Sequence, residues 1–351
     1  MRNMIASNIK AFENLINQLF DSANIISEFG KRFISTNPEE KRWLSETAVI
    51  ECLNVLPNVR ALRVEFDNFI FLILIGVTNQ KYEYDSTVIE ENDSNAGLIT
   101  LLISENYLRI NPTINFLEFD DNIMSQHKDI DYKGHNYIDL LNFLEPFQIF
   151  KIPDSSLLIN ENLHRILIYV YSNNPNNLIL KFNKSVLELV SDISLVSSKN
   201  ISYGLLLYSL LSTNYKHSFL ELYRLVERLF PINYLKDLHQ KIITELTFLE
   251  FTSELENVTS WRPREDEAIE KIFSISRLNT KEAFRVFLDS SVYLQTQTDY
   301  KYFYKLRNSI VHFRANHEEY DLTDSQWNLL IFATVSLIDE QYSLYNKILE
   351  E

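Results

Sequence analysis

The pattern of hydrophobic residues changes about halfway along this chain, and this change limits the folds that the chain can adopt. Residues 59–66 and 69–77 are short apolar runs of the kind that form buried strands. Residues 171–177 (YSNNPNN) indicate a loop or linker, and beyond them apolar residues recur at the spacings of three and four that are typical of helices. We therefore expect an α+β fold, with a mixed α/β domain at residues 1–175 and an all-α domain at residues 176–351.

The first of these domains carries the patterns of both helices and strands. Asp67 and Asn68 lie between the two apolar runs and predict the turn of a β-hairpin. Residues 97–104 and 114–119 are apolar enough to add further strands. The other elements that we expect here are helices at residues 5–19, 38–53 and 136–144, and a strand at residues 147–152.

The second domain shows helical patterns only. Asn279 with Glu282, and Thr323 with Gln326, have the spacing of an N-cap residue and its partner three positions inside a helix. The helices that the apolar periodicity predicts lie at residues 184–196, 203–211, 217–230, 234–255 and 327–348.

Composition and charge narrow the classes of function. The formal net charge of −15 argues against a stable coat on long nucleic acid and against an anionic membrane surface, so RNA would have to bind in a local basic pocket. With a single cysteine, Cys52, an intramolecular disulfide framework and a cysteine-based zinc site are excluded. The longest apolar run, Phe69–Val77, is too short to cross a bilayer, and the first residues lack the apolar centre of a signal peptide. We expect a cytoplasmic protein with no membrane contact.

The residues RNSIVH, 307–312, carry the side chains best suited to chemistry. Asn308 and His312 are four positions apart, so on a helix they share one face. Arg307 lies about 100° round the helix from Asn308, but its long side chain can reach the surroundings of the imidazole. The surrounding segment, residues 300–313, predicts a helix whose buried stripe consists of Phe303, Leu306, Ile310 and Phe313.

These three side chains suit the cleavage of an RNA phosphodiester. Histidine titrates near neutral pH, so His312 can take or give a proton when the 2′-hydroxyl attacks the phosphorus. Arginine offers a planar fork of donors, so Arg307 can bind the phosphate and stabilise the charge that develops on it. Asn308 can orient His312 or hold the backbone. This chemistry needs no metal and no cofactor, and we expect neither.

At these residues the sequence resembles the HEPN superfamily of helical ribonuclease and nucleotide-binding domains. The motif of that family is Arg-x(4–6)-His with Asn, Asp or His favoured after the Arg, and Arg307, Asn308 and His312 match it at its shortest spacing. HEPN domains often carry an acidic residue on an earlier helix, and Glu227 in residues 219–230 matches that residue. The resemblance extends over about residues 202–345.

The resemblance implies more than the spacing does. HEPN domains typically dimerise, so that the motifs of two protomers form one composite cleft, and active members cut RNA without a metal. Many bacterial members act in antiviral abortive infection or as toxins, often fused to a sensing domain. We therefore expect an RNA substrate, a homodimer, and an antitoxin, sensor or companion defence subunit as a further partner.

Other interpretations remain open at this point. The Arg and His can be solvated, or can interact with the dipole at the end of their helix. A HEPN-like fold can also serve only for dimerisation and for binding of RNA, a nucleotide or a protein partner. Glu227 can pair with Arg224 or Arg307 and fix the orientation of the guanidinium. Arg314 can add a phosphate contact, or can be an ordinary surface residue.

Two polar segments outside this motif require an interpretation. His127, Asp129, Asp131 and His135 lie close together in the sequence and could hold a zinc or manganese ion, although the run is polar and typical of a loop. A metal-dependent enzyme centred on these residues is the third hypothesis. The charged residues 262–271 (RPREDEAIEK) predict the start of a helix, because acidic side chains in a first turn interact favourably with the helix dipole.

Overall fold

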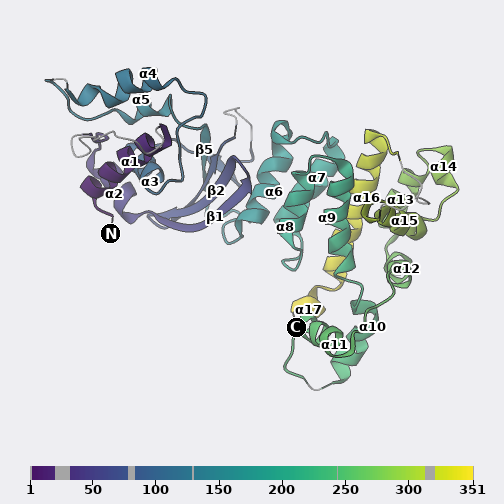
Figure 1. Ribbon diagram of the computed structural model, residues 1–351. Helices are drawn as coiled ribbons and strands as arrows, with labels where there is room; N and C mark the ends of the chain where they lie inside the picture. The colour runs from purple at the N-terminus through teal and green to yellow at the C-terminus, as the bar shows by residue number, and fades with distance from the viewer. Residues whose placement is uncertain are drawn as a thin grey trace. The chain divides into compact units, whose positions relative to one another are not determined.

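The chain divides into two compact units, Met1–Leu163 and His164–Glu351. The computed structural model describes residues 2–19, 32–77, 84–128, 130–242, 244–312 and 321–350. Figure 1 traces the elements along the chain. The first unit contains a five-stranded antiparallel sheet with helices, and the described part of the second unit contains helices and no strand, so the expected α+β class is confirmed. The division follows Leu163, whereas the sequence predicted a boundary after Pro175.

The sheet of the first unit is built around one hairpin. Strand β2 (Val59–Phe66) pairs with β3 (Phe69–Ile75), and Asp67 and Asn68 form the two-residue turn between them. Both turn residues have positive φ, 52° and 64°, which is the backbone that such a turn requires and that Asn and Asp tolerate. The predicted hairpin is therefore confirmed. The full strand order is β1-β2-β3-β5-β4, with β1 at Ala48–Leu56, β5 at Phe147–Ile152 and β4 at Glu90–Glu91.

Helices cover one face of this sheet and form a core with it. Helices α1 (Met4–Leu19), α2 (Pro38–Glu46) and α3 (Ala96–Ser104) lie beside the strands in Figure 1. Shorter helical segments follow: α4 (Phe116–Phe119), a π-helical turn (Asp120–Met124), a 3-10 turn (Gln126–Lys128) and α5 (Tyr137–Leu141). Fully buried members of the core include Phe12, Leu15, Leu62, Val64, Ile73, Leu98, Leu102 and Phe119.

Two elements of the first unit differ from the sequence prediction. Residues 97–104, predicted as a strand, form helix α3, and every residue of that helix is buried. A helix buried on all sides has no polar stripe, so its sequence cannot be distinguished from that of a buried strand by periodicity. Residues 114–119 likewise contain helix α4 instead of a strand.

The helix predicted at residues 38–53 ends at Glu46, and strand β1 follows it. Asn37 and Glu40 form a capping box at the start of this helix. In β1 the exposed fraction alternates from residue to residue, as in a strand at the edge of a sheet. Its mixture of apolar and polar residues also fits a helix, which explains the wrong prediction.

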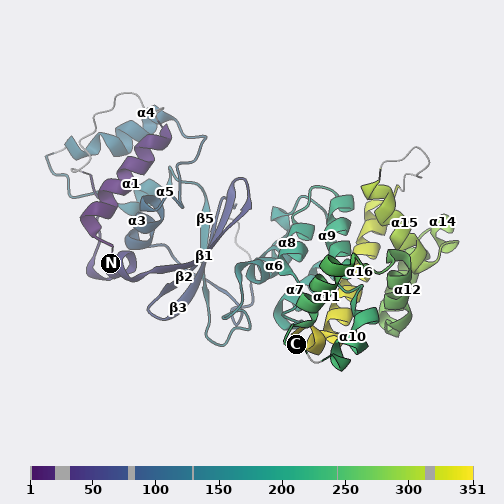
Figure 2. The ribbon, with the colours of Figure 1, turned by 60° about the horizontal axis from the view of Figure 1, so that its bottom comes forward.

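The second unit is a bundle around one long helix. Helix α16 (Asp324–Leu344) packs against α7 (Lys184–Val196), α9 (Tyr215–Glu227) and α13 (Leu278–Leu288). Figure 2 shows it among the other helices. The remaining helices are α6 (Leu163–Asn173), α8 (Tyr203–Leu210), α10 (Ile232–Lys241), α11 (Phe248–Thr259), α12 (Glu265–Ile275), α14 (Val292–Gln295), α15 (Asp299–Val311) and α17 (Asn346–Glu350).

Most helices predicted in this unit are confirmed, with some differences. The segment predicted as one helix, 327–348, contains most of α16 and the start of α17, with Tyr345 between them. Residues 234–255 form two helices, α10 and α11, instead of one. Helix α6 continues through Asn173 into the segment predicted as a linker, and a 3-10 turn, Pro175–Asn177, follows it. In the part of the chain that the structure describes, no helix combines the length and the apolar character needed to span a membrane.

The two predicted N-caps of this unit have different outcomes. Thr323 and Gln326 form the expected capping box at the start of α16. Asn279 is not the N-cap of α13, because that helix starts after Arg277, which makes no side-chain cap. Instead the Glu340 carboxylate, from α16, accepts hydrogen bonds from the Arg277 backbone N–H (2.7 Å) and from the Thr280 hydroxyl (2.5 Å). A side chain distant in the sequence therefore satisfies the free backbone donor.

The His135 imidazole is buried in the first unit without a hydrogen-bond partner among the described residues. Only 2% of this residue is exposed, and the ring lies 5.2 Å from the Phe12 ring and 5.1 Å from the Tyr132 ring, measured between centroids. Burial, together with the positive charge of Arg32 and the neighbouring His127, lowers the pKa of His135 from 6.5 to about 4. The ring is therefore neutral in the folded chain at neutral pH.

This burial predicts a specific loss of stability in acid. In the unfolded chain His135 binds a proton below its ordinary pKa of 6.5, whereas in the folded chain it stays neutral until about pH 4. The free energy of unfolding therefore falls as the pH drops from 6.5 to about 4. The steepest slope from this one group is about 1.4 kcal/mol per pH unit. Urea unfolding at a series of pH values measures the slope. His135→Phe should flatten the curve, and His217→Gln, at an exposed site, should not. Equal slopes in all three proteins would contradict the assignment.

Candidate functional site

The helix that carries the predicted motif is held in place by aromatic packing. The Phe303 ring of α15 lies 5.1 Å from Phe219, 5.2 Å from Tyr223, 5.6 Å from Phe273 and 6.0 Å from Phe284, measured between centroids. These rings belong to α9, α12 and α13, so one side chain joins four helices. Of the predicted buried stripe, Phe303 and Leu306 are fully buried and Ile310 is half-buried, whereas Phe313 lies outside the described residues.

Arg307 lies one turn beyond Phe303, and its guanidinium is enclosed by polar groups. Nη1 donates a hydrogen bond of 2.9 Å to Asn308 Oδ1 and lies 3.4 Å from Glu265 Oε2. Nη2 lies 3.7 Å from Glu227 Oε1. The guanidinium carbon is 5.4 Å from the centroid of the Tyr223 ring, within the range of a cation–π contact. The Arg307 side chain is 17% exposed, so the cation is largely removed from water.

This arrangement joins three of the predicted residues. Arg307 is hydrogen-bonded to Asn308 and ion-paired with Glu227. Of the two expected partners of Glu227, Arg307 is therefore the one with which it forms an ion pair. Arg224 pairs with Glu221 at 3.1 Å on the surface of α9. Within the described residues, the only hydrogen bond that Arg307 donates from its side chain uses Nη1.

Two further groups at this site were not predicted from the sequence. Glu265 opens α12, and its Oε2 atom is buried without a hydrogen bond from any described residue. The Tyr223 hydroxyl is also buried and has no such partner. Burial, and secondly the charge of Glu265, raises the pKa of this phenol, so the hydroxyl stays protonated. The sequence offered no signal for Glu265, because Asp266 and Glu267 follow it and all three fit the predicted acidic first turn of a helix.

Two acidic side chains contact the Arg307 guanidinium directly. Two carboxylates, Glu227 and Glu265, face one guanidinium. Burial raises the pKa of Glu227, and Glu265 adds to this effect, whereas Arg307 and, more weakly, Arg224 and Arg262 oppose it. The ionised form of Glu227 is therefore disfavoured relative to a carboxylate in water, in spite of its ion pair.

His312 lies at the end of the helix instead of within it. Helix α15 ends at Val311, and His312 is its C-cap, with extended backbone (φ −111°, ψ 103°) and an N–H that donates to the Asn308 carbonyl at 2.9 Å. The predicted helix over residues 300–313 is therefore too long at its end. The His312 side chain is exposed, and among the described residues it makes no hydrogen bond or ion pair. Arg314, the other predicted phosphate contact, lies outside the described residues.

The alternative metal site receives no support from geometry. His127 lies in a 3-10 turn, where its Nδ1 contacts the Met124 carbonyl at 2.8 Å. Asp129 lies outside the described residues, and His135 is buried between aromatic rings. Within the described ranges, no three His, Cys, Asp or Glu side chains are grouped so as to hold a metal ion.

Comparisons with known proteins add no further information on the site. Neither the models of protein families, nor the curated proteins, nor the solved structures contain a significant match to this chain.

The ion pairs of Arg307 predict a measurable coupling energy. Arg307→Ala leaves two carboxylates close together without their cation, and because these are partly exposed we expect a loss of about 1–2 kcal/mol in the free energy of unfolding. A double-mutant cycle with Glu265→Gln should give a coupling of about 0.5–1.5 kcal/mol. Urea denaturation of the four proteins measures it. Arg224→Ala, which breaks an exposed pair on α9, is the control and should cost less than about 0.5 kcal/mol. A coupling of zero would show that the contacts with Glu265 carry no energy.

Proposed function

We propose that this protein is a metal-independent endoribonuclease of the HEPN type whose active residues lie on and just after α15. The observation that supports this most directly is that Arg307 and Asn308 are joined by a hydrogen bond, and that an exposed imidazole, His312, follows four positions after Asn308 at the end of the same helix. A guanidinium for the phosphate and an imidazole for the proton are the two groups that cleavage of RNA requires.

In this proposal the 2′ oxygen of the ribose attacks the adjacent phosphorus, and the bond to the 5′ oxygen breaks. His312 accepts the proton of the 2′-hydroxyl or gives one to the departing 5′ oxygen. One imidazole has one of these roles at a time, so a second copy of His312, from a partner protomer, would supply the other. Arg307 binds the non-bridging oxygens and stabilises the charge that develops on them. Asn308 keeps the guanidinium in position.

Arg307 has to exchange a partner before it can bind a phosphate. Its Nη1 atom is engaged by Asn308 and Glu265, and its Nη2 atom faces Glu227 only through an ion pair at 3.7 Å. The phosphate would displace Glu227, whose ionised form is already disfavoured by burial. In this proposal Glu227 therefore holds Arg307 in the free protein, gives up that contact to the phosphate and carries no proton.

The biological role follows from the family resemblance and is also a proposal. We infer a cytoplasmic effector of bacterial antiviral defence, such as abortive infection, or a toxin, that acts as a homodimer on RNA. The first unit would receive the activating signal, and an antitoxin or companion defence subunit could bind it.

A second candidate function is a non-catalytic HEPN-like scaffold for dimerisation or for binding RNA, a nucleotide or a protein. The enclosure of Arg307 by Glu227, Glu265 and Asn308 favours it. A guanidinium with these polar neighbours can have a purely structural role, in which it joins α15 to α9 and α12. This scaffold would bind its partner without turnover.

Cleavage of RNA by the purified chain tests the first proposal. Total RNA or tRNA should be cut in the presence of EDTA, and His312→Ala should lower the rate by at least about 100-fold because general acid–base catalysis is lost. Arg307→Ala should lower it by a similar factor. Gel electrophoresis of end-labelled RNA measures the rate, and urea denaturation shows whether the variants fold.

Two control variants make this test specific. His217→Ala and Arg224→Ala change an exposed histidine and an exposed arginine of α9, and both should cut RNA at the rate of the unaltered chain. Cleavage that persists in folded His312→Ala and Arg307→Ala proteins would exclude this site. RNA binding without cleavage, unchanged in His312→Ala, would favour the scaffold.

A further inference from the structure

The outer edge of strand β5 contains a gap between two paired segments. At one end, Glu90 and Glu91 of β4 pair with Lys151 and Phe150, and the Asn92 N–H donates to the Ile149 carbonyl at 2.9 Å. At the other end, the Asn111 N–H donates to the Phe143 carbonyl and the Glu145 N–H donates to the Arg109 carbonyl, each at 2.9 Å. Phe147 lies between these two pairings.

The backbone N–H and C=O of Phe147 face this gap. On the inner edge, the Pro146 carbonyl accepts from the Gly76 N–H at 2.7 Å, so Pro146, Gln148 and Phe150 direct their backbone groups toward β3. Backbone groups alternate between the two edges of an antiparallel strand, so those of Phe147 point outward, like those of Glu145 and Ile149. Within the described residues neither group of Phe147 has a hydrogen-bond partner.

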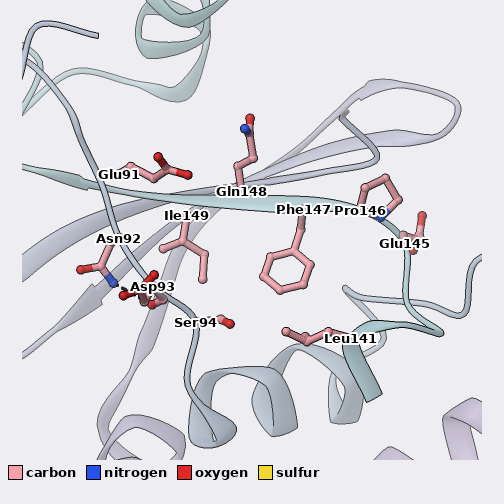
Figure 3. A pocket seen from close by; sticks show the side chains of 10 residues that line it. All are labelled: Glu91, Asn92, Asp93, Ser94, Leu141, Glu145, Pro146, Phe147, Gln148 and Ile149. Atoms are coloured by element: carbon pink, nitrogen blue, oxygen red, sulfur yellow. Dashed lines mark hydrogen bonds between the residues drawn. The ribbon is translucent and has the colours of Figure 1, made fainter. Parts of the chain in front are cut away.

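A cavity of about 290 Å³ lies along this gap. Figure 3 shows that the Phe147 and Ile149 side chains point into it on the side of Leu141, whereas Gln148 points away. The cavity therefore has an apolar floor and, at its edge, one unused donor and one unused acceptor. Asp93 supplies negative charge at the rim on this side, whereas the Glu91 side chain points to the side of Gln148 (Figure 3).

Of the acidic groups at the rim, Glu145 is already engaged. Its carboxylate forms an ion pair with Arg60, and it also accepts a hydrogen bond from the Arg109 N–H at 2.9 Å. Among the described residues, Glu91 makes no salt bridge and Asp93 makes none. The cavity therefore presents negative charge, which disfavours a phosphate and favours a neutral or cationic ligand.

We propose that this cavity binds a nucleobase, as a free base or a nucleoside without phosphate. Such a heterocycle has a donor and an acceptor side by side on one edge, which match the C=O and N–H of Phe147, and its flat faces suit the apolar floor. An extended peptide does not fit, because Asn92 and Arg109 occupy the edge at both ends of the gap. This site lies in the first unit and does not depend on the nuclease proposal.

Isothermal titration of the full chain with adenosine, cytidine, guanosine and uridine tests the proposal. At least one of them should bind. Removal of the donor should weaken binding by at least about 10-fold. The donor is removed in N6,N6-dimethyladenosine for adenosine and in N4,N4-dimethylcytidine for cytidine. The 5′-monophosphate should bind about 10-fold more weakly than its nucleoside, and Asp93→Asn should reduce this difference.

A pair of variants on α5 locates the site. Leu141→Trp should fill the cavity and abolish binding, whereas Ile138→Trp, at a position that is 54% exposed on the same helix, should leave it unchanged. The proposal is overturned if no nucleoside binds at millimolar concentration. It is also overturned if binding survives in a folded Leu141→Trp protein, or if methylation of the donor has no effect.

Discussion

The packing of Phe303 is the contact on which the geometry around Arg307 depends. Its ring packs against aromatic side chains of α9, α12 and α13. Helix α9 carries Glu227, and helix α12 carries Glu265. Because the carboxylates are carried by the helices that this ring joins, the hydrophobic packing and the ion pairs reinforce each other. A largely desolvated guanidinium between two carboxylates is stable only where such packing holds all three in place. The same arrangement is therefore compatible with a structural role and with a catalytic role for Arg307.

The sequence predicted those elements whose pattern is local. The hairpin with Asp67 and Asn68 at its turn follows from residues that accept positive φ, and the capping box of Thr323 follows from a spacing of three. Residues 97–104 were wrongly predicted because burial on every side removes the polar stripe that marks a helix. Asn279 was wrongly predicted as an N-cap because the actual cap, Glu340, comes from another helix.

At the candidate site, residue types were predictable and their distances were not. The motif identified Arg307, Asn308 and His312, and the match to an earlier acidic helix identified Glu227. The position of His312 beyond the last helical residue depends on where α15 ends, and sequence patterns define helix ends poorly. Glu265 approaches Arg307 only because α12 packs against α15, which is a tertiary contact with no local signal.

The carboxylate of Glu340 has a consequence for the order of events during synthesis. It completes the first turn of α13 from a position sixty residues later in the chain, and the same helix, α16, lies at the centre of the bundle. While the ribosome is still adding α16, the preceding helices lack both their central packing partner and this acceptor. The second unit therefore reaches its native arrangement only after α16 has emerged, whereas the sheet unit can fold earlier. A nascent chain would thus expose no assembled Arg307 site until translation of the bundle is nearly finished.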